Sequence, residues 1–193
     1  FDKTRVSAVG YVTENRVTNI GPEAWTRENG ALSIWMLGMF NPSARTVIVI
    51  PYRTDAPGAI VKDDYFGRIP ADRLRIDSGS SRILFSADGN WRSKLGLTNR
   101  RATGVLGSYD AENRILTVVR YSPGPADAEY VNAAWELQER PFEGDTVNAY
   151  NDGPLADGSR MGPFYELESS SPAGFPAPGG SFLHTHATFH FTG

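Results

Sequence analysis

Glycine and proline occur throughout this chain and divide it into short segments, and this feature limits its fold more than any other. The sequence contains 20 glycines and 13 prolines among 193 residues. No long stretch combines an apolar stripe at positions i, i+3 and i+4 with helix-capping residues. Short apolar or alternating runs between turn signals are instead typical of an antiparallel β-sandwich or barrel. We therefore predict an all-β antiparallel sandwich with little helix.

The predicted strands are the runs bounded by turn signals: residues 5–12, 31–40, 46–52, 82–86, 114–121, 130–138, 146–150, 163–168 and 181–191. Asp88-Gly89 and Glu14-Asn15 suit tight turns, because such residues tolerate positive φ. Residues 110–113 are a predicted hairpin loop between residues 105–109 and 114–121. Three longer stretches are predicted loops: residues 54–79, 122–128 and 151–162. No repeat or composition shift marks a second domain, so residues 1–193 form one predicted domain.

The composition excludes several classes of protein. Without cysteine, the chain has no disulfide, no thiolate chemistry and no Cys-ligated zinc or iron–sulfur centre. Its 19 Lys and Arg and 22 Asp and Glu give a net charge of −3 without basic clusters, so we expect no nucleic-acid or membrane partner. No apolar run approaches the roughly 20 residues that cross a bilayer. Because the chain starts at Phe1, we expect a processed protein or a piece of a longer one.

All three histidines of the chain, His184, His186 and His190, lie in its last ten residues. Side chains alternate along a strand, so the three share one face of the predicted strand 181–191. The opposite face is the predicted core side: Leu183, Thr185, Ala187, Phe189 and Phe191. In residues 163–168 the same alternation places Glu166 and Glu168 together. In residues 130–138 it places Tyr130, Asn132, Glu136 and Gln138 opposite the apolar Val131, Ala133, Trp135 and Leu137.

These histidines and glutamates have three interpretations. Same-face neighbours in a strand lie roughly 7 Å apart, so His184 and His186 can converge on one ligand. With His190 and Glu166 they would form a metal site whose nitrogen and oxygen ligands suit Zn, Mn, Fe or Cu. Without metal, a histidine and Glu166 or Glu168 would form an acid–base pair. The third interpretation is that the histidines decorate a solvent-facing strand.

The remaining candidates carry weaker signals. Lys94 would neutralise a carboxylate or deprotonate a sugar α-carbon, although an exposed lysine is the simpler interpretation. Trp25 and Trp91 lie beside predicted loops and offer flat faces for a sugar ring, whereas Trp135 is predicted in the core. Residues 151–159 form an oxygen-rich loop without the alternating carboxylates of a Ca²⁺ motif. No nucleophile elbow, P-loop or dinucleotide fingerprint is present.

Residues 162–172 and 178–191, together with 106–113 and 147–153, carry a resemblance to a known family. They resemble an uncharacterised bacterial family with a galactose-mutarotase-like (aldose 1-epimerase-like) supersandwich. The resemblance covers most of the chain, and members are usually longer, so it implies the C-terminal portion of one or a naturally short version. Residues 178–186 also look like the start of a cupin metal motif, but His190 stands where a cupin has glutamate and no further strands follow.

The resemblance implies that a concave sheet face binds a sugar and that Glu166 or Glu168 and His184 or His186 transfer protons. Our first hypothesis is therefore a carbohydrate-active protein of epimerase, lyase or hydrolase type. The candidate substrate-binding residues are Asn132, Glu136, Tyr130, Lys94 and Trp91. The second hypothesis is a metal-dependent ester or lactone hydrolase, or an oxidase, using His184, His186 and Glu166 with a divalent metal (Zn, Mn, Fe, Cu or Ca). The third is a non-catalytic carbohydrate-binding module.

Two further expectations concern the whole protein. If half of a sheet is missing relative to longer relatives, the exposed edge strand favours association, and we expect a homodimer. The sequence contains no signal peptide that would indicate a compartment. The resemblance to a bacterial family implies a bacterial protein, which we expect to be secreted or periplasmic.

Overall fold

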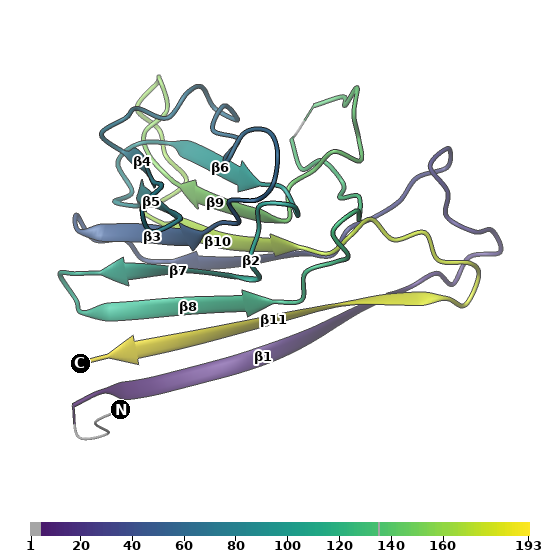
Figure 1. The fold of residues 1–193 in the computed structure, drawn as a ribbon, viewed down its shortest axis with the longest axis horizontal. Helices are drawn as coiled ribbons and strands as arrows, with labels where there is room; N and C mark the ends of the chain where they lie inside the picture. Colours follow the sequence, from purple (N-terminus) through teal and green to yellow (C-terminus); the bar gives the residue numbers. More distant parts are fainter. Residues whose placement is uncertain (1–4, 135) are drawn as a thin grey trace.

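The computed structural model describes residues 5–134 and 136–193 and consists of two antiparallel sheets (Figure 1). The seven-stranded sheet has the order β1-β11-β8-β7-β3-β5-β4, and the four-stranded sheet has the order β2-β10-β9-β6. The described residues contain no helix, and thus none that could span a bilayer. The predicted all-β antiparallel sandwich is confirmed.

The larger sheet contains β1 (Ser7–Thr18), β3 (Thr46–Pro51), β4 (Leu74–Asp77), β5 (Arg82–Ser86), β7 (Val105–Asp110), β8 (Ile115–Tyr121) and β11 (Ser181–Thr192). The smaller contains β2 (Trp35–Phe40), β6 (Ser93–Leu97), β9 (Val147–Asn151) and β10 (Tyr165–Ser170).

The core lies between the two sheets. Alternate side chains of each strand point inward, so Ile48 and Ile50 of β3 share one apolar cluster with Leu95, Ala149 and Leu167 of the smaller sheet. Full burial of one aliphatic side chain of this size stabilises the fold by about 1.5–3 kcal/mol. The intervening residues of β6, β9 and β10 must therefore point away from the core.

β1 and β11 form a long ribbon at one side of the larger sheet (Figure 1). They pair along their whole length, from Ser7 opposite Thr192 to Thr18 opposite Ser181. β1 is the edge strand of this sheet, and its Val9, Tyr11 and Val12 are largely exposed. An exposed apolar edge is a place where a second chain can pair. The homodimer stays a prediction that this edge makes reasonable.

Most predicted strands coincide with observed ones, and the hairpin loop before β8 is present. Residues 130–138 form no strand where they are described, because their backbone closes local turns such as Glu136 N–H to Ala134 C=O. β4 and β6 lie where no strand was predicted, since short segments with a central charge or glycine show little alternation. Glu14 and Asn15 lie inside β1 rather than in a turn. Trp135, a predicted core residue, lies outside the described residues.

Candidate functional site

The face of the four-stranded sheet that points away from the core is the outer face, and it carries chemistry-bearing side chains. Residues paired directly across neighbouring strands share a face. Across β6, β9, β10 and β2 the outer face has one row of Lys94, Tyr150, Glu166 and Met39 and a second row of Gly96, Asn148, Glu168 and Leu37. The sheet therefore brings together a lysine, a tyrosine and both glutamates singled out in the sequence.

Glu168 is the most enclosed member of the outer face, with none of its surface exposed. Its Oε2 accepts hydrogen bonds from Lys94 Nζ at 2.9 Å and from Trp35 Nε1 at 2.8 Å. Its Oε1 is buried and has no such donor. Removing one partner of a buried ion pair typically costs about 3–5 kcal/mol, because the other charge is left uncompensated. Lys94 and Glu168 thus form a buried ion pair on the outer face.

Glu166 lies next to Glu168 on the same face and retains 8% of its surface. Burial, the charge of Glu168 and a hydrogen bond between the two carboxyl groups raise the pKa of Glu166 to about 7. The negative charge of Glu168 thus favours the protonated form of Glu166 near neutral pH. A pKa close to the working pH is the property that a general acid or base requires. The raised pKa of Glu166 lies in this range.

Exposed apolar side chains surround this pair. Trp35 is 44% exposed, Met39 56% and Phe66 45%. Trp35 bonds to Glu168, Met39 is paired with Glu166, and the Phe66 ring lies 5.9 Å from that of Tyr150. We call these three residues the apolar rim. The Arg92 guanidinium lies over the Phe66 ring, 3.8 Å from its centre. The exposed indole of Trp35 is therefore the flat face beside the buried polar groups that suits the packing of a sugar ring.

A second polar group occupies the other end of the same face. Tyr65 donates a hydrogen bond to Asp145 and accepts one from Asn148 Nδ2 at 3.2 Å. Burial raises the pKa of both Asp145 and Tyr65. The Asp145 carboxyl fills the space left by the absent side chain of Gly96, where a Cβ would lie 2.5 Å from Asp145 Cγ. Glycine at position 96 is therefore required for this arrangement.

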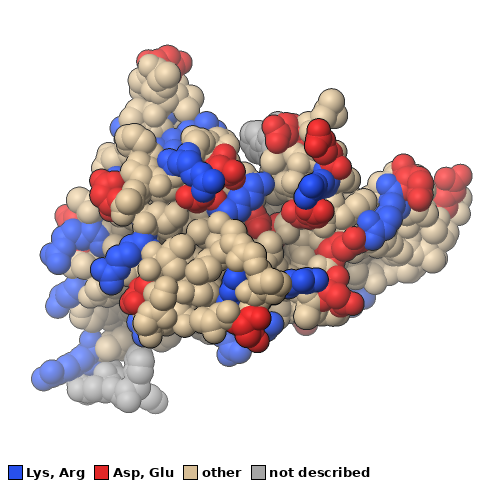
Figure 2. Space-filling view, turned by 45° about the horizontal axis from the view of Figure 1, so that its top comes forward, with Lys and Arg blue, Asp and Glu red and all other residues tan. Residues whose placement is uncertain are grey.

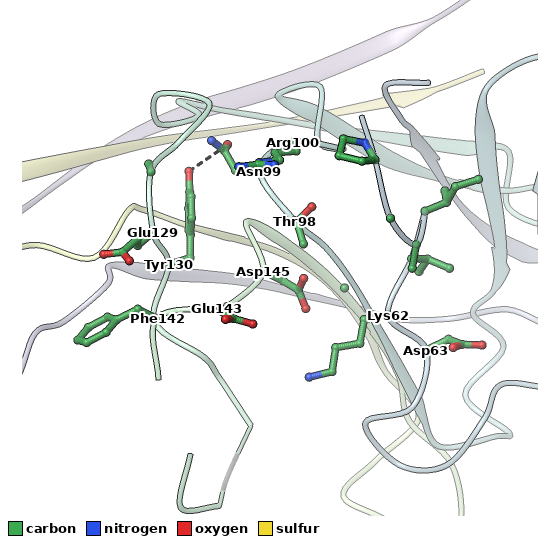
Figure 3. Close-up of a pocket in the computed structure, with 18 of the residues that line it drawn as sticks. Lys62, Asp63, Thr98, Asn99, Arg100, Glu129, Tyr130, Phe142, Glu143 and Asp145 are labelled. Carbon is green, nitrogen blue, oxygen red and sulfur yellow. Dashed lines mark hydrogen bonds between the residues drawn. The ribbon is translucent and has the colours of Figure 1, made fainter. Parts of the chain in front are cut away.

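A cavity of about 720 Å³ opens beside Asp145 (Figure 3). Its walls come from the segments 57–64, 96–100, 126–130 and 142–145, with Arg68 at one side. Lys62, Gly96 and Asp145 belong both to this lining and to the end of the outer face. The cavity therefore adjoins the end of the outer face at which Gly96 and Asp145 are buried.

The histidines lie inside the sandwich. His184 and His186 are 0% and 3% exposed, and Ser169 Oγ lies 2.8 Å from both His184 Nε2 and His186 Nδ1. Burial and the neighbouring His186 lower the pKa of His184 to about 4. The prediction that the face of Leu183 is the core side is wrong, because the histidine face points inward and Leu183 is 49% exposed, although Ala187 on the same face is buried. A serine from the facing sheet satisfies the imidazoles and makes their burial possible.

The four-stranded sheet separates these histidines from the glutamates. Ser169 points inward to His184 and His186, and its neighbour Glu168 points outward. The predicted combination of His184 or His186 with Glu166 or Glu168 is therefore not formed. His190 contacts Thr117 Oγ1 at 3.0 Å instead of joining a ligand set. Within residues 5–134 and 136–193 no three His, Asp or Glu side chains are arranged to hold a metal ion.

The predicted substrate-binding residues are dispersed, and only Lys94 belongs to the outer face. Tyr130 is buried, donates to Asn99 Oδ1 at 3.2 Å and lines the cavity (Figure 3). Asn132 accepts a hydrogen bond from the backbone of Ala134, and Glu136 is exposed. Trp91 is 50% exposed beside β6.

Sequence reasoning did not single out Tyr65, Asp145 or Asn148. Tyr65 and Asp145 lie outside the strands, in irregular segments that carry no periodic signal. Asn148 is in β9, all five residues of which are buried, so no alternation of apolar and polar residues distinguished its outward face.

Comparison with known sequences shows to which family the chain belongs. Residues 2–193 match DUF6786, a family of unknown function. The chain belongs to the DUF6786 family. No curated protein sequence matches this DUF6786 chain.

Two solved structures resemble the DUF6786 chain. The Slr1438 protein of Synechocystis sp. PCC 6803 has a TM-score of 0.50 and 10% identity, over 95% of this chain and 50% of that one. A putative aldose 1-epimerase of Escherichia coli K12 has a TM-score of 0.53 and 12% identity, over 94% of this chain and 56% of that one. The DUF6786 chain thus spans about half the length of either protein. The resemblance to a galactose-mutarotase-like fold is confirmed.

Proposed function

We propose that this protein binds a carbohydrate on the outer face and that Glu166 exchanges a proton with it. The observation that supports this most strongly is the position of Glu166 beside Glu168 on the outer face, where burial and the charge of Glu168 raise the pKa of Glu166 to about 7. The apolar rim beside the pair offers a surface for a sugar ring. The fold that the chain shares with a putative aldose 1-epimerase supports a carbohydrate as the ligand.

The chemistry that suits this site is ring opening of an aldose. Glu166 donates its proton to the ring oxygen while water takes the proton of the anomeric hydroxyl, and the bond between the anomeric carbon and the ring oxygen breaks. The open-chain aldehyde rotates, and the reverse proton transfers close the ring with the other anomeric configuration. Glu166 regains its proton, so the reaction needs no further reactant.

Glu168 and Lys94 act through Glu166 and are positioning residues. Glu168 is fully enclosed, so its charge sets the pKa of Glu166 without reaching the sugar. Lys94 in turn holds the Glu168 carboxylate at 2.9 Å. Since the acid must carry its proton, turnover declines as the pH rises through about 7.

The test is NMR exchange spectroscopy, which measures interconversion of α and β anomers for a panel of hexoses and hexuronic acids. We expect Glu166→Gln to lower the rate by about 10²–10⁴-fold. Glu112→Gln, an exposed change in the hairpin loop before β8, is the matched control and should be silent. Glu168→Gln removes the charge that raises the pKa of Glu166, so the decline in rate shifts to lower pH. An unchanged rate in Glu166→Gln contradicts the proposal, as does sugar binding without anomer exchange, which favours a non-catalytic module.

A further inference from the structure

Arg92 is a charged side chain of the outer face that the proposed function does not use. It lies two residues before Lys94, so the alternation of β6 places both on the same face. Its guanidinium lies over the Phe66 ring, and its Nε donates a hydrogen bond to the hydroxyl of Tyr150 at 3.2 Å. Tyr150 is paired directly with Glu166. Arg92 and the proposed acid therefore lie on either side of Tyr150.

The contacts of Arg92 fix its position and leave its outer donors for a ligand. The hydroxyl of Tyr150 donates in turn to Asp152 Oδ1 at 2.9 Å, and the backbone N–H of Gly162 donates to Asp152 Oδ2 at 3.0 Å. Asp152 is buried, and it holds Tyr150 rather than contacting Arg92 itself. In residues 5–134 and 136–193, neither Nη atom of Arg92 has a hydrogen-bond partner. The half-buried guanidinium thus keeps most of its rigid fork of donors available.

Arg92 is also a cation that forms no ion pair within the part of the chain that the structure describes. Lys94, the other cation of this row, is neutralised by Glu168 at 2.9 Å. On the surface that Figure 2 shows, acidic and basic side chains are interspersed and form no broad patch of one sign. An anionic group beside Glu166 would therefore be held by contact with Arg92 and not by a general positive field.

The position of Arg92 relative to Glu166 suits the carboxylate of a sugar acid. The planar fork of an arginine matches the two oxygens of a carboxylate. In a hexuronic acid the carboxylate is attached to the carbon next to the ring oxygen, which is the atom that Glu166 protonates in the proposed reaction. The backbones of β6 and β10 are separated by β9 and lie roughly 10 Å apart, so one pyranose ring can reach both side chains. The single charge of Arg92 balances a carboxylate, whereas a phosphate ester carries about two negative charges near neutral pH.

We propose that Arg92 binds the carboxylate of a hexuronic acid, so that the substrate of this site is a sugar acid rather than a neutral hexose. The inference rests on the proposed function and narrows its substrate class. Arg92 determines specificity, since it contacts the carboxylate and takes no part in the proton transfer by Glu166. The contact joins two charged groups, so added salt weakens it.

The test measures kcat and KM for anomer exchange by NMR, for each hexose of the panel and for the hexuronic acid of the same configuration. We expect the wild-type kcat/KM to be about tenfold or more higher for the hexuronic acid. Arg92→Gln should raise KM for the hexuronic acid by about 10–100-fold and change the exchange of the hexose little. Arg92→Lys keeps the charge but not the planar fork, so its KM should be intermediate. Arg120→Gln, exposed on the face of β8 opposite the buried Val119, is the matched control and should change neither sugar.

Equal wild-type kcat/KM for both members of every pair overturns the carboxylate site, and this comparison does not depend on the folding of any variant. It leaves the proposed function standing, provided that Glu166→Gln still lowers the exchange of the hexose. An equal rise in KM for both sugars in Arg92→Gln also overturns the inference, because Arg92 then holds the sugar and not its carboxylate. A higher kcat/KM for a hexose 6-phosphate than for the hexuronic acid overturns the carboxylate as the anion. If the wild-type protein exchanges the anomers of no sugar in the panel, the proposed function fails and this inference fails with it.

Discussion

Burial of His184 couples the stability of the fold to pH. Its pKa is lowered from 6.5 to about 4, chiefly by burial. The unfolded chain takes up a proton at this residue below pH 6.5, whereas the folded protein does so only near pH 4. The free energy of unfolding therefore falls as the pH is lowered through this window. At about 1.4 kcal/mol for each pKa unit, the full effect is about 3 kcal/mol.

The raised pKa of Glu166 changes the free energy of unfolding with pH in the opposite direction. Its folded-state pKa is about 7 against an ordinary value of 4.5, so the folded protein keeps a proton that the unfolded chain releases. Its contribution to stability is complete below pH 4.5 and is lost as the pH rises to 7. The two groups oppose each other between pH 4.5 and 6.5, and the wild-type stability changes little there on their account.

Urea unfolding followed by tryptophan fluorescence at pH values from 4 to 7 separates the two effects. His184→Gln removes the effect of the buried histidine. Lowering the pH from 7 to 4 should therefore reduce the free energy of unfolding of this variant by about 3 kcal/mol less than that of the wild type. Glu166→Gln should change the pH dependence with the opposite sign. His190→Gln, a half-buried histidine on the same strand, is the control. Parallel stability curves for His184→Gln and wild type would refute the argument from burial.

Three further predictions concern the sheet edge and the outer face. Gly96→Ala should cost about 1–3 kcal/mol in urea unfolding, because its Cβ meets the Asp145 carboxyl, whereas Gly79→Ala should cost less; equal costs contradict the close approach. Light scattering should give the mass of a dimer that Val12→Lys converts to a monomer, and a monomeric wild type contradicts pairing at the β1 edge. Trp35→Ala should weaken sugar binding more than Trp91→Ala, and the reverse order would move the sugar away from the apolar rim.

Alternation along strands predicted which residues share a face but not always which way that face points. In β10 the apolar face points into the core as predicted, because Leu167 is buried there and Glu166 and Glu168 point outward. In β11 the polar face points inward, since Ser169 from the other sheet supplies hydrogen bonds to both buried histidines. The sequence of one strand contains no information about the partner that faces it, so the apolar side was assigned to the core by default.

The site itself depends on contacts between distant segments. Lys94 was singled out, but its strand was not predicted, and its pairing with Glu168 joins residues 74 positions apart. Tyr65 reaches Asp145 across 80 positions from a loop that carries no pattern of its own. Such contacts are determined by how the loop folds over β6, which local periodicity does not encode.

The most direct test of the central claim is the titration of the Glu166 carboxyl group, followed by ¹³C NMR in protein labelled at glutamate and assigned with Glu166→Gln. The burial of Glu166 beside the charge of Glu168 predicts an apparent pKa near 7 in the free protein, and binding of a sugar should shift this resonance. A carboxyl that titrates near its ordinary value of 4.5 and does not respond to any sugar of the panel would contradict the account.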